Sequence, residues 1–220
     1  MNQLMTLVTS ATIETLQMVV LSTIFSLLLG LPLGILLCIT ASEQQGGIIP
    51  HPILNQVVGR IVNVLRSFPF IILMILLFPL SRIILGTSIG TTAAIVPLSI
   101  AAAPFVARVI ESALKEVDPG VVQAAKSMGS TNWQIIHKVL IPEAMPSLVA
   151  GITLTIINLI GYSAMAGAIG GGGLGDLAIR YGYQRFRGDV MIASVIVILV
   201  LVEVVQVVGD KMVARLMEKR

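Results

Sequence analysis

Long apolar runs without charge constrain this chain more than any other feature. Residues 15–41 and residues 144–175 contain no Asp, Glu, Lys or Arg. A helix rises about 1.5 Å per residue, so each run is long enough to cross the roughly 30 Å hydrocarbon core of a bilayer. The whole chain is 56% hydrophobic and 11% charged, whereas soluble domains carry about 25% charged residues. The sequence therefore predicts an all-α polytopic membrane protein.

Five stretches are expected to form transmembrane helices within one domain that covers residues 1–220. They lie at about 15–41, 57–84, 90–112, 144–168 and 190–212. The second is the least regular, because Pro69 and Pro79 interrupt its hydrogen-bond ladder. We expect residues 66–70 to bend there. In the first stretch, Gly30 and Gly34 form a small-xxx-small pattern that favours close helix packing.

The stretch 118–140, between the third and fourth spans, is the longest polar-to-amphipathic segment. Asp118 followed by Pro119 predicts a helix start, with an N-cap oxygen and a proline at the first helical position. Gly129 predicts the end of this helix, because glycine enters the left-handed cap without steric cost. The expected apolar face of the helix consists of Val121, Val122, Ala124, Ala125 and Met128.

A second short helix is expected after Gly129. Ser130 can cap it, and Trp133, Ile136 and Leu140 would share one side. Two helices that are too short and too polar to span a bilayer suit a docking surface at the membrane face. An ordinary connecting loop is the alternative interpretation of this stretch.

The distribution of Lys and Arg predicts the orientation. With five spans and the N-terminus outside, the cytoplasmic side holds Arg60, Arg66, Arg108, Lys115, Lys126, Lys138, Lys211, Arg215, Lys219 and Arg220. The outer side then holds only Arg82, Arg180, Arg185 and Arg187. The positive-inside rule selects this orientation. It places the stretch 118–140 and the C-terminus in the cytoplasm.

Several chemistries are disfavoured by the sequence. Gly170, Gly172 and Gly175 match a dinucleotide fingerprint, but we expect them to form a tight exposed loop outside the membrane rather than part of a βαβ unit. No Walker A motif is present, so the chain is not expected to hydrolyse ATP or to bind a nucleotide itself. No cluster of His, Cys or carboxylates suggests a metal, and the dispersed Lys and Arg do not suggest nucleic acid. Cys38 is expected to pack.

A hydroxyl and a thioether lie close together in the fourth span. Residues 161–165 include Tyr162, Ser163 and Met165, which suit the wall or gate of a pathway for a small zwitterion. Plain core packing is the alternative for Met165. An intramembrane serine hydrolase using Ser163 is a further alternative, but it requires a general base near the serine, and His51 and His137 lie outside the spans.

Charged residues within spans are candidates for function. Arg66 in the second span and Glu203 in the fifth are the two that stand out. The alternative for Arg66 is snorkelling to the headgroups. Glu203 is expected to pair with an Arg or to lie near the cytoplasmic interface, and a proton relay is the alternative role. Residues 108–116 are expected to carry the third helix into water, with Glu111 and Lys115 forming a weak i,i+4 pair.

The stretch 118–140 resembles the EAA loop of ABC importer permeases. The resemblance rests on Gln123-Ala124-Ala125, on Gly129, and on Leu140-Ile141-Pro142. In that family the loop forms a coupling helix that docks on an ATPase subunit. The resemblance implies that Gln123, Ala124, Ala125, Met128 and Gly129 serve this coupling. Gln123 stands where the family usually has Glu, so a hydrogen bond would replace a salt bridge there.

Further strings resemble one branch of this family, the permease subunits of methionine-uptake ABC importers with the type I fold. They are residues 66–73, 86–90, 102–108, 142–144 and 161–165. The resemblance implies a homodimer of five-helix subunits in a bacterial inner membrane. It also implies two copies of a separate ATPase, which carries ATP and Mg, and an external substrate-binding lipoprotein. Methionine, in the L and possibly the D form, is the implied substrate; a permease for another small amino acid is the alternative.

Overall fold

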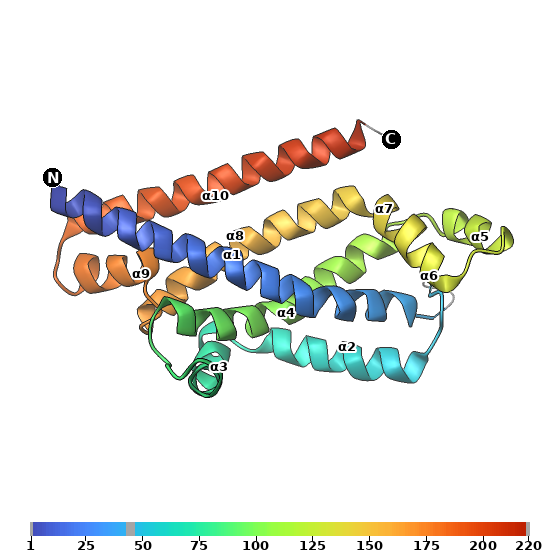
Figure 1. The fold of residues 1–220 in the computed structure, drawn as a ribbon, viewed down its shortest axis with the longest axis horizontal. Helices are drawn as coiled ribbons and strands as arrows, with labels where there is room; N and C mark the ends of the chain where they lie inside the picture. Colours follow the sequence, from blue (N-terminus) through green and yellow to red (C-terminus); the bar gives the residue numbers. More distant parts are fainter. Residues whose placement is uncertain (1, 43–46, 219–220) are drawn as a thin grey trace. The chain divides into compact units, whose positions relative to one another are not determined.

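The computed structural model describes residues 2–42 and 47–218, with side chains from Leu4 onward. Every regular element in the described residues is helical (Figure 1). The helices are α1 (Asn2–Ile39), α2 (Pro52–Ser67), α3 (Phe70–Leu85), α4 (Thr91–Lys115), α5 (Pro119–Ser127), α6 (Asn132–Ile135), η2 (Ile136–Leu140), α7 (Ile141–Glu143), α8 (Met145–Ala168), α9 (Gly173–Leu177), η3 (Ala178–Tyr183) and α10 (Gly188–Met217). The segments η2 and η3 are π-helical.

The predicted all-α membrane class is confirmed. Four helices of the described chain are long and apolar enough to cross a membrane, namely Leu4–Ile39, Thr91–Lys115, Met145–Ala168 and Gly188–Met217. The count rises to five when the bent pair of α2 and α3 is taken as one span. Helix α1 begins well before residue 15, and Pro32 lies inside it without ending it.

The bend expected in the second span is present. Helix α2 ends at Ser67 and α3 begins at Phe70, so Phe68 and Pro69 separate them. The break follows from proline chemistry, since Pro69 cannot donate a backbone hydrogen bond and restricts the residue before it. Pro79 lies inside α3 and does not end this helix, although it cannot donate a hydrogen bond to the preceding turn.

The chain divides into two compact units. The first comprises Met1–Ser26, Phe68–Ala102 and Leu154–Val207; the second comprises Leu27–Ser67, Ala103–Thr153 and Val208–Arg220. Each has its own apolar core. In the first unit, a core of Met18, Met74, Leu98 and Leu159 joins parts of α1, α3, α4 and α8. A single transmembrane domain over the whole chain stays a prediction.

The core of the second unit joins the end of α4 to the segment that follows it. Leu114 and Val117 pack with Val122 and Ala125 of α5 and with Leu140 of η2. Cys38 is buried in the same core, as expected.

The close packing predicted for the glycines of α1 is also found in the second unit. A Cβ at Gly30 would lie 2.6 Å from Val106 Cγ1, and a Cβ at Gly34 would lie 2.7 Å from the Ala107 carbonyl oxygen. Only glycine permits this approach of α1 to α4.

The glycine-rich segment of the first unit is not the exposed loop that the sequence suggested. Gly171, Gly173 and Gly175 are buried, and α9 begins at Gly173. Glu14 and Thr15 of α1 accept hydrogen bonds from the backbone N–H groups of Gly173 and Leu174, at 2.7 and 2.9 Å. The segment is therefore packed because side chains of α1, distant in sequence, satisfy its backbone donors.

The orientation across the membrane stays a prediction. Lys219 and Arg220, which contribute to the predicted cytoplasmic charge, lie outside the described residues.

Candidate coupling segment and membrane pathway

Helix α5 begins and ends as its sequence predicts. Asp118 Oδ1 accepts a hydrogen bond from the Gly120 N–H at 2.7 Å, and Pro119 occupies the first turn. At the other end Gly129 has a φ of +79°. Ser130 N–H donates to the Ala125 carbonyl at 3.1 Å, and Gly129 N–H donates to the Lys126 carbonyl at 3.0 Å. This pair of bonds is a Schellman motif, which ends the helix sharply.

The second short helix starts one residue later than expected. Thr131, not Ser130, is its N-cap, and Thr131 and Gln134 form a reciprocal capping box. Thr131 N–H donates to Gln134 Oε1 at 2.9 Å, and Gln134 N–H donates to Thr131 Oγ1 at 3.3 Å. The Gln three residues after Thr131 was the available signal. It favours Thr131 because both partners then satisfy a free backbone donor.

The predicted apolar face of α5 is divided between the interior and the solvent. Val122 and Ala125 are buried in the core of the second unit. Val121, Ala124 and Met128 are exposed. The division follows helical geometry, since residues three apart share a face and their immediate neighbours do not.

Residues 118–140, the candidate coupling segment, display both polar and apolar side chains on their exposed surface. Gln123, Ala124 and Gly129 are exposed, and 79% of Met128 is exposed. Trp133 was expected to share one side with Ile136 and Leu140, but 67% of it is exposed, whereas the other two are buried. Its ring lies against that of His137, with ring centroids 3.8 Å apart. A surface that displays Met and Trp has the composition of a protein-binding patch.

Four of the five predicted coupling residues are therefore available to a partner. The exception is Ala125, which lies in the core and can only support the helix. Trp133 is a further candidate that sequence reasoning did not name, because it grouped this residue with Ile136 and Leu140. The buried face of this helix is supplied by Ile135 and Ile136. These two adjacent apolar residues were the sequence signal that could have identified Trp133 as exposed.

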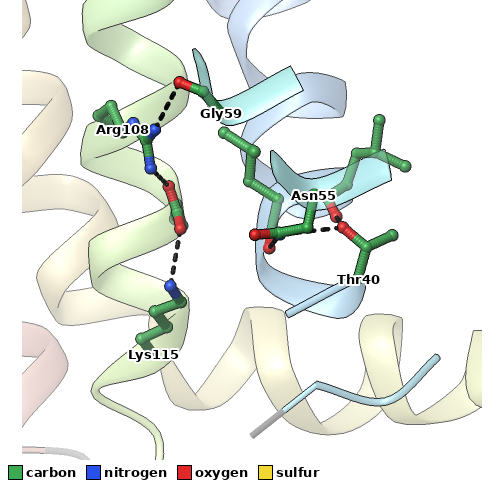
Figure 2. Close-up of polar contacts among 8 residues, drawn as sticks. Thr40, Asn55, Gly59, Arg108 and Lys115 are labelled. Atoms are coloured by element: carbon green, nitrogen blue, oxygen red, sulfur yellow. Dashed lines mark hydrogen bonds and ion pairs between the residues drawn. The ribbon is translucent and has the colours of Figure 1, made fainter. Parts of the chain in front are cut away.

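We expected residues 108–116 to carry the third helix into water, but part of this stretch is buried. Only 5% of Glu111 is exposed. Its two carboxylate oxygens accept from Arg108 Nη1 at 2.6 Å and from Lys115 Nζ at 2.7 Å. The i,i+4 pair with Lys115 is confirmed, but it is one half of a partly buried three-charge network (Figure 2).

This network reaches a second helix. Arg108 Nη2 donates to the Gly59 carbonyl of α2 at 2.9 Å. One turn away, Asn55 Nδ2 donates to the Leu37 carbonyl at 2.7 Å and to Thr40 Oγ1 at 3.1 Å. Figure 2 shows both sets of contacts, which connect α4, α2 and the end of α1.

The candidate pathway residues of α8 lie in the first unit and differ in exposure. Tyr162 is half-buried and stacks on Phe70, with ring centroids 3.8 Å apart and an angle of 9° between the planes. Ser163 is buried and donates to the Ile160 carbonyl of its own helix at 2.7 Å. Met165 is 46% exposed. Of the three, Met165 is therefore the most available to a passing solute.

The two intramembrane charges also differ. Arg66 is exposed, with its guanidinium 6.0 Å from the Phe105 ring centroid. It borders a groove of about 340 Å³ that Arg108, Ser112, Glu116 and Ser147 also line. Ser147 donates a short hydrogen bond to Glu116. Glu203 is exposed on α10, and within the described residues it has none of the Arg pairing that we considered.

No group of three or more His, Cys, Asp or Glu side chains within the described residues could hold a metal ion.

Comparison with known proteins identifies the family. Residues 30–218 match the family model described as "Binding-protein-dependent transport system inner membrane component". A "Probable D-methionine transport system permease protein MetI" from Vibrio cholerae is 50% identical over 209 residues, which cover 95% of this chain and 92% of the relative. The "Methionine import system permease protein MetP" from Bacillus subtilis is 48% identical over 177 residues, which cover 80% of this chain and 79% of that protein.

The fold agrees with a solved transporter. A chain described under "Inward facing conformations of the MetNI methionine ABC transporter" matches with a TM-score of 0.95 and 45% identity, covering 98% of this chain and 99% of that chain. The chain therefore belongs to the family of inner membrane components of binding-protein-dependent transport systems. It is a multi-pass membrane permease with the type I importer fold.

Proposed function

We propose that this chain is the permease subunit of an ABC importer for methionine, in the L and D forms. The observation that most supports this is the agreement over nearly the full chain, in sequence and in fold, with relatives named as methionine permeases. A permease for another small amino acid remains the alternative substrate assignment. The chain itself is proposed to be no enzyme, with ATP and Mg bound by a separate subunit.

Two copies of an ABC ATPase would dock on the coupling segment of a permease homodimer. Gln123, Ala124, Met128 and Gly129 supply the contact, since their side chains or backbone are exposed. Ala125 holds α5 on the permease core. The Gln123 side chain can form a hydrogen bond with the ATPase. Burying this neutral amide costs less desolvation free energy than burying a carboxylate would.

The pathway would be formed where two permease subunits meet. Tyr162, Ser163 and Met165 line it in this proposal, and Met165, being flexible and soft, is suited to act as an apolar gate. A substrate-binding lipoprotein delivers the amino acid from outside. The N-terminus lies outside and the C-terminus in the cytoplasm of a bacterial inner membrane, in accord with the positive-inside rule.

The direct test is ATP-dependent uptake in liposomes. The chain is reconstituted with its co-expressed ATPase and binding protein, and labelled L- and D-methionine are compared with other amino acids. Selective methionine uptake is the expected result. ATP-dependent uptake of another amino acid alone would overturn the substrate, and absence of any uptake from a stable complex would overturn the pathway assignment.

The docking assignment has its own test. Ala124→Arg places a long charged side chain on the exposed face of α5, and Gln184→Arg, at an exposed position of the first unit, serves as the control. We expect Ala124→Arg to abolish co-purification of the ATPase and Gln184→Arg to leave it unchanged. Unimpaired binding by Ala124→Arg would show that this face is not the docking surface.

A further inference from the structure

The three-charge network lies in the last two turns of α4, which the coupling segment follows in the chain. Glu111 accepts one hydrogen bond from each of two cations, Arg108 and Lys115, and is almost fully buried. Burying charges carries a large desolvation cost, and apolar residues of similar volume often stabilise a core as well or better. Stability alone therefore gives a weak reason for three charges at this point of α4.

The network fixes the position of α4 relative to α2. Arg108 uses one guanidinium nitrogen for Glu111 and another for the Gly59 carbonyl of α2. The planar fork fixes both angles at once, which an apolar contact cannot do. The contact is tight, because a Cβ at Gly59 would lie 3.3 Å from Arg108 Nη2. The network thus sets the register between α4 and α2.

The other end of the network meets the coupling segment. Lys115 lines a cavity of about 240 Å³ together with Val122, Gln123 and Lys126 of α5. Next to it, Leu114 packs in the same apolar core as Val122 and Ala125. Displacement of α5 therefore acts on the end of α4 that carries Lys115 and Glu111.

We propose that Arg108, Glu111 and Lys115 form a transmission link, which carries the movement of the coupling segment to α2 and the end of α1 as one rigid body. Glu111 is its positioning residue, because it holds the Arg108 fork toward Gly59. Asn55 extends the link to α1 through the Leu37 carbonyl and Thr40. This inference rests on the proposed function as an ATP-driven permease.

The link can be weakened in two independent ways. Glu111→Gln removes the negative charge and can accept from only one of the two cations. Gly59→Ala leaves every charge in place but crowds Arg108 Nη2. Asp189→Asn is the control, since it removes an exposed ion pair with Arg187 of the same 2.6 Å length in the first unit.

The functional readout is the ratio of methionine uptake to ATP hydrolysis in liposomes. We expect Glu111→Gln to lower this ratio about tenfold and Gly59→Ala to lower it less, with ATPase co-purification and hydrolysis retained. Asp189→Asn should keep the wild-type ratio. An unchanged ratio in both link variants would overturn the proposal, and so would a parallel loss of uptake and hydrolysis, which indicates lost docking or folding.

A distance measurement tests the link without relying on transport. Spin labels at Asn63→Cys on α2 and Ser127→Cys on α5, in a Cys38→Ala background, report the separation of these helices by pulsed electron paramagnetic resonance. In the complex with a hydrolysis-deficient ATPase, we expect ATP to leave this distance unchanged in the wild type and to shift or broaden it in Glu111→Gln. A distance that ATP changes in the wild type, or one that Glu111→Gln leaves unaltered, would overturn the rigid link. Failure of the ATPase to bind the wild-type chain would instead overturn the proposed function.

Discussion

Glu14 of α1 accepts a hydrogen bond from the backbone N–H of Gly173 at 2.7 Å, across 159 positions of sequence. The adjacent Thr15 accepts from Leu174 N–H at 2.9 Å. Together these side chains satisfy the first backbone donors of α9, which have no partner within their own helix. The Gly90 N–H bond to the Gly170 carbonyl, at 2.9 Å, holds the same segment from the start of α4.

Removing the Glu14 carboxylate should destabilise the first unit. Glu14→Ala leaves the Gly173 N–H without its acceptor, which costs about 1–3 kcal/mol in a buried setting. We expect a lower thermal unfolding midpoint in detergent micelles. Glu14→Gln keeps an acceptor oxygen and should retain most of the stability. Equal midpoints for wild type and Glu14→Ala would contradict the assigned hydrogen bond.

Gly173 should tolerate no side chain. Its φ is +77°, and an added Cβ would lie 2.7 Å from both Met18 Cε and Thr15 Oγ1. Left-handed strain and overpacking together predict a loss of about 2–4 kcal/mol for Gly173→Ala. Gly188→Ala is the matched control, because a Cβ there meets nothing within 4 Å. This account would be refuted if Gly173→Ala and Gly188→Ala gave the same unfolding curve.

Trp133 should contribute to ATPase binding but little to folding. Trp133→Ala removes an aromatic side chain that is 67% exposed. If it is an interface hot spot, the ATPase affinity should fall about 30-fold, or ~2 kcal/mol, with an unchanged unfolding midpoint. Tyr183→Ala, which removes a 70% exposed aromatic from the first unit, is the control. If Trp133→Ala bound the ATPase with wild-type affinity, Trp133 would not belong to the docking surface.

Ser163 should not act as a nucleophile. Its hydroxyl donates to the Ile160 carbonyl of the same helix, so it lacks the activated geometry that nucleophilic catalysis requires. We expect Ser163→Ala to retain methionine uptake within about threefold, since a neutral helix hydrogen bond contributes ~1 kcal/mol or less. Complete loss of methionine uptake in a folded Ser163→Ala variant would contradict this expectation.

Local signals allowed much of the candidate coupling site to be predicted. Asp118, Pro119 and Gly129 mark the ends of α5, and the structure places all three in these roles. Caps and prolines act through hydrogen bonds and steric contacts within a few residues, so their effect can be predicted without knowledge of the tertiary structure. The Ser130 error has the same basis, because two adjacent hydroxyl residues could each cap and only the partner Gln134 decides between them.

Exposure within the coupling segment was less predictable. The periodicity of α5 and α6 shows which residues share a face, but not which face meets the core. Burial of Val122, Ala125, Ile135 and Ile136 by the end of α4 decided that question. As a result, Ala124, Met128 and Trp133 are exposed.

The sequence by itself determined the membrane class, the presence and approximate positions of the long apolar helices, the break at Pro69 and the ends of α5. These features depend on composition and on interactions between near neighbours, which every copy of the sequence carries whatever its fold. Tertiary structure decided the burial of Glu111 between two cations and the packing of the glycine segment against Glu14. Both depend on groups distant in the chain or on the packing around them, because a buried donor or charge is tolerated only where folding brings its partner into reach.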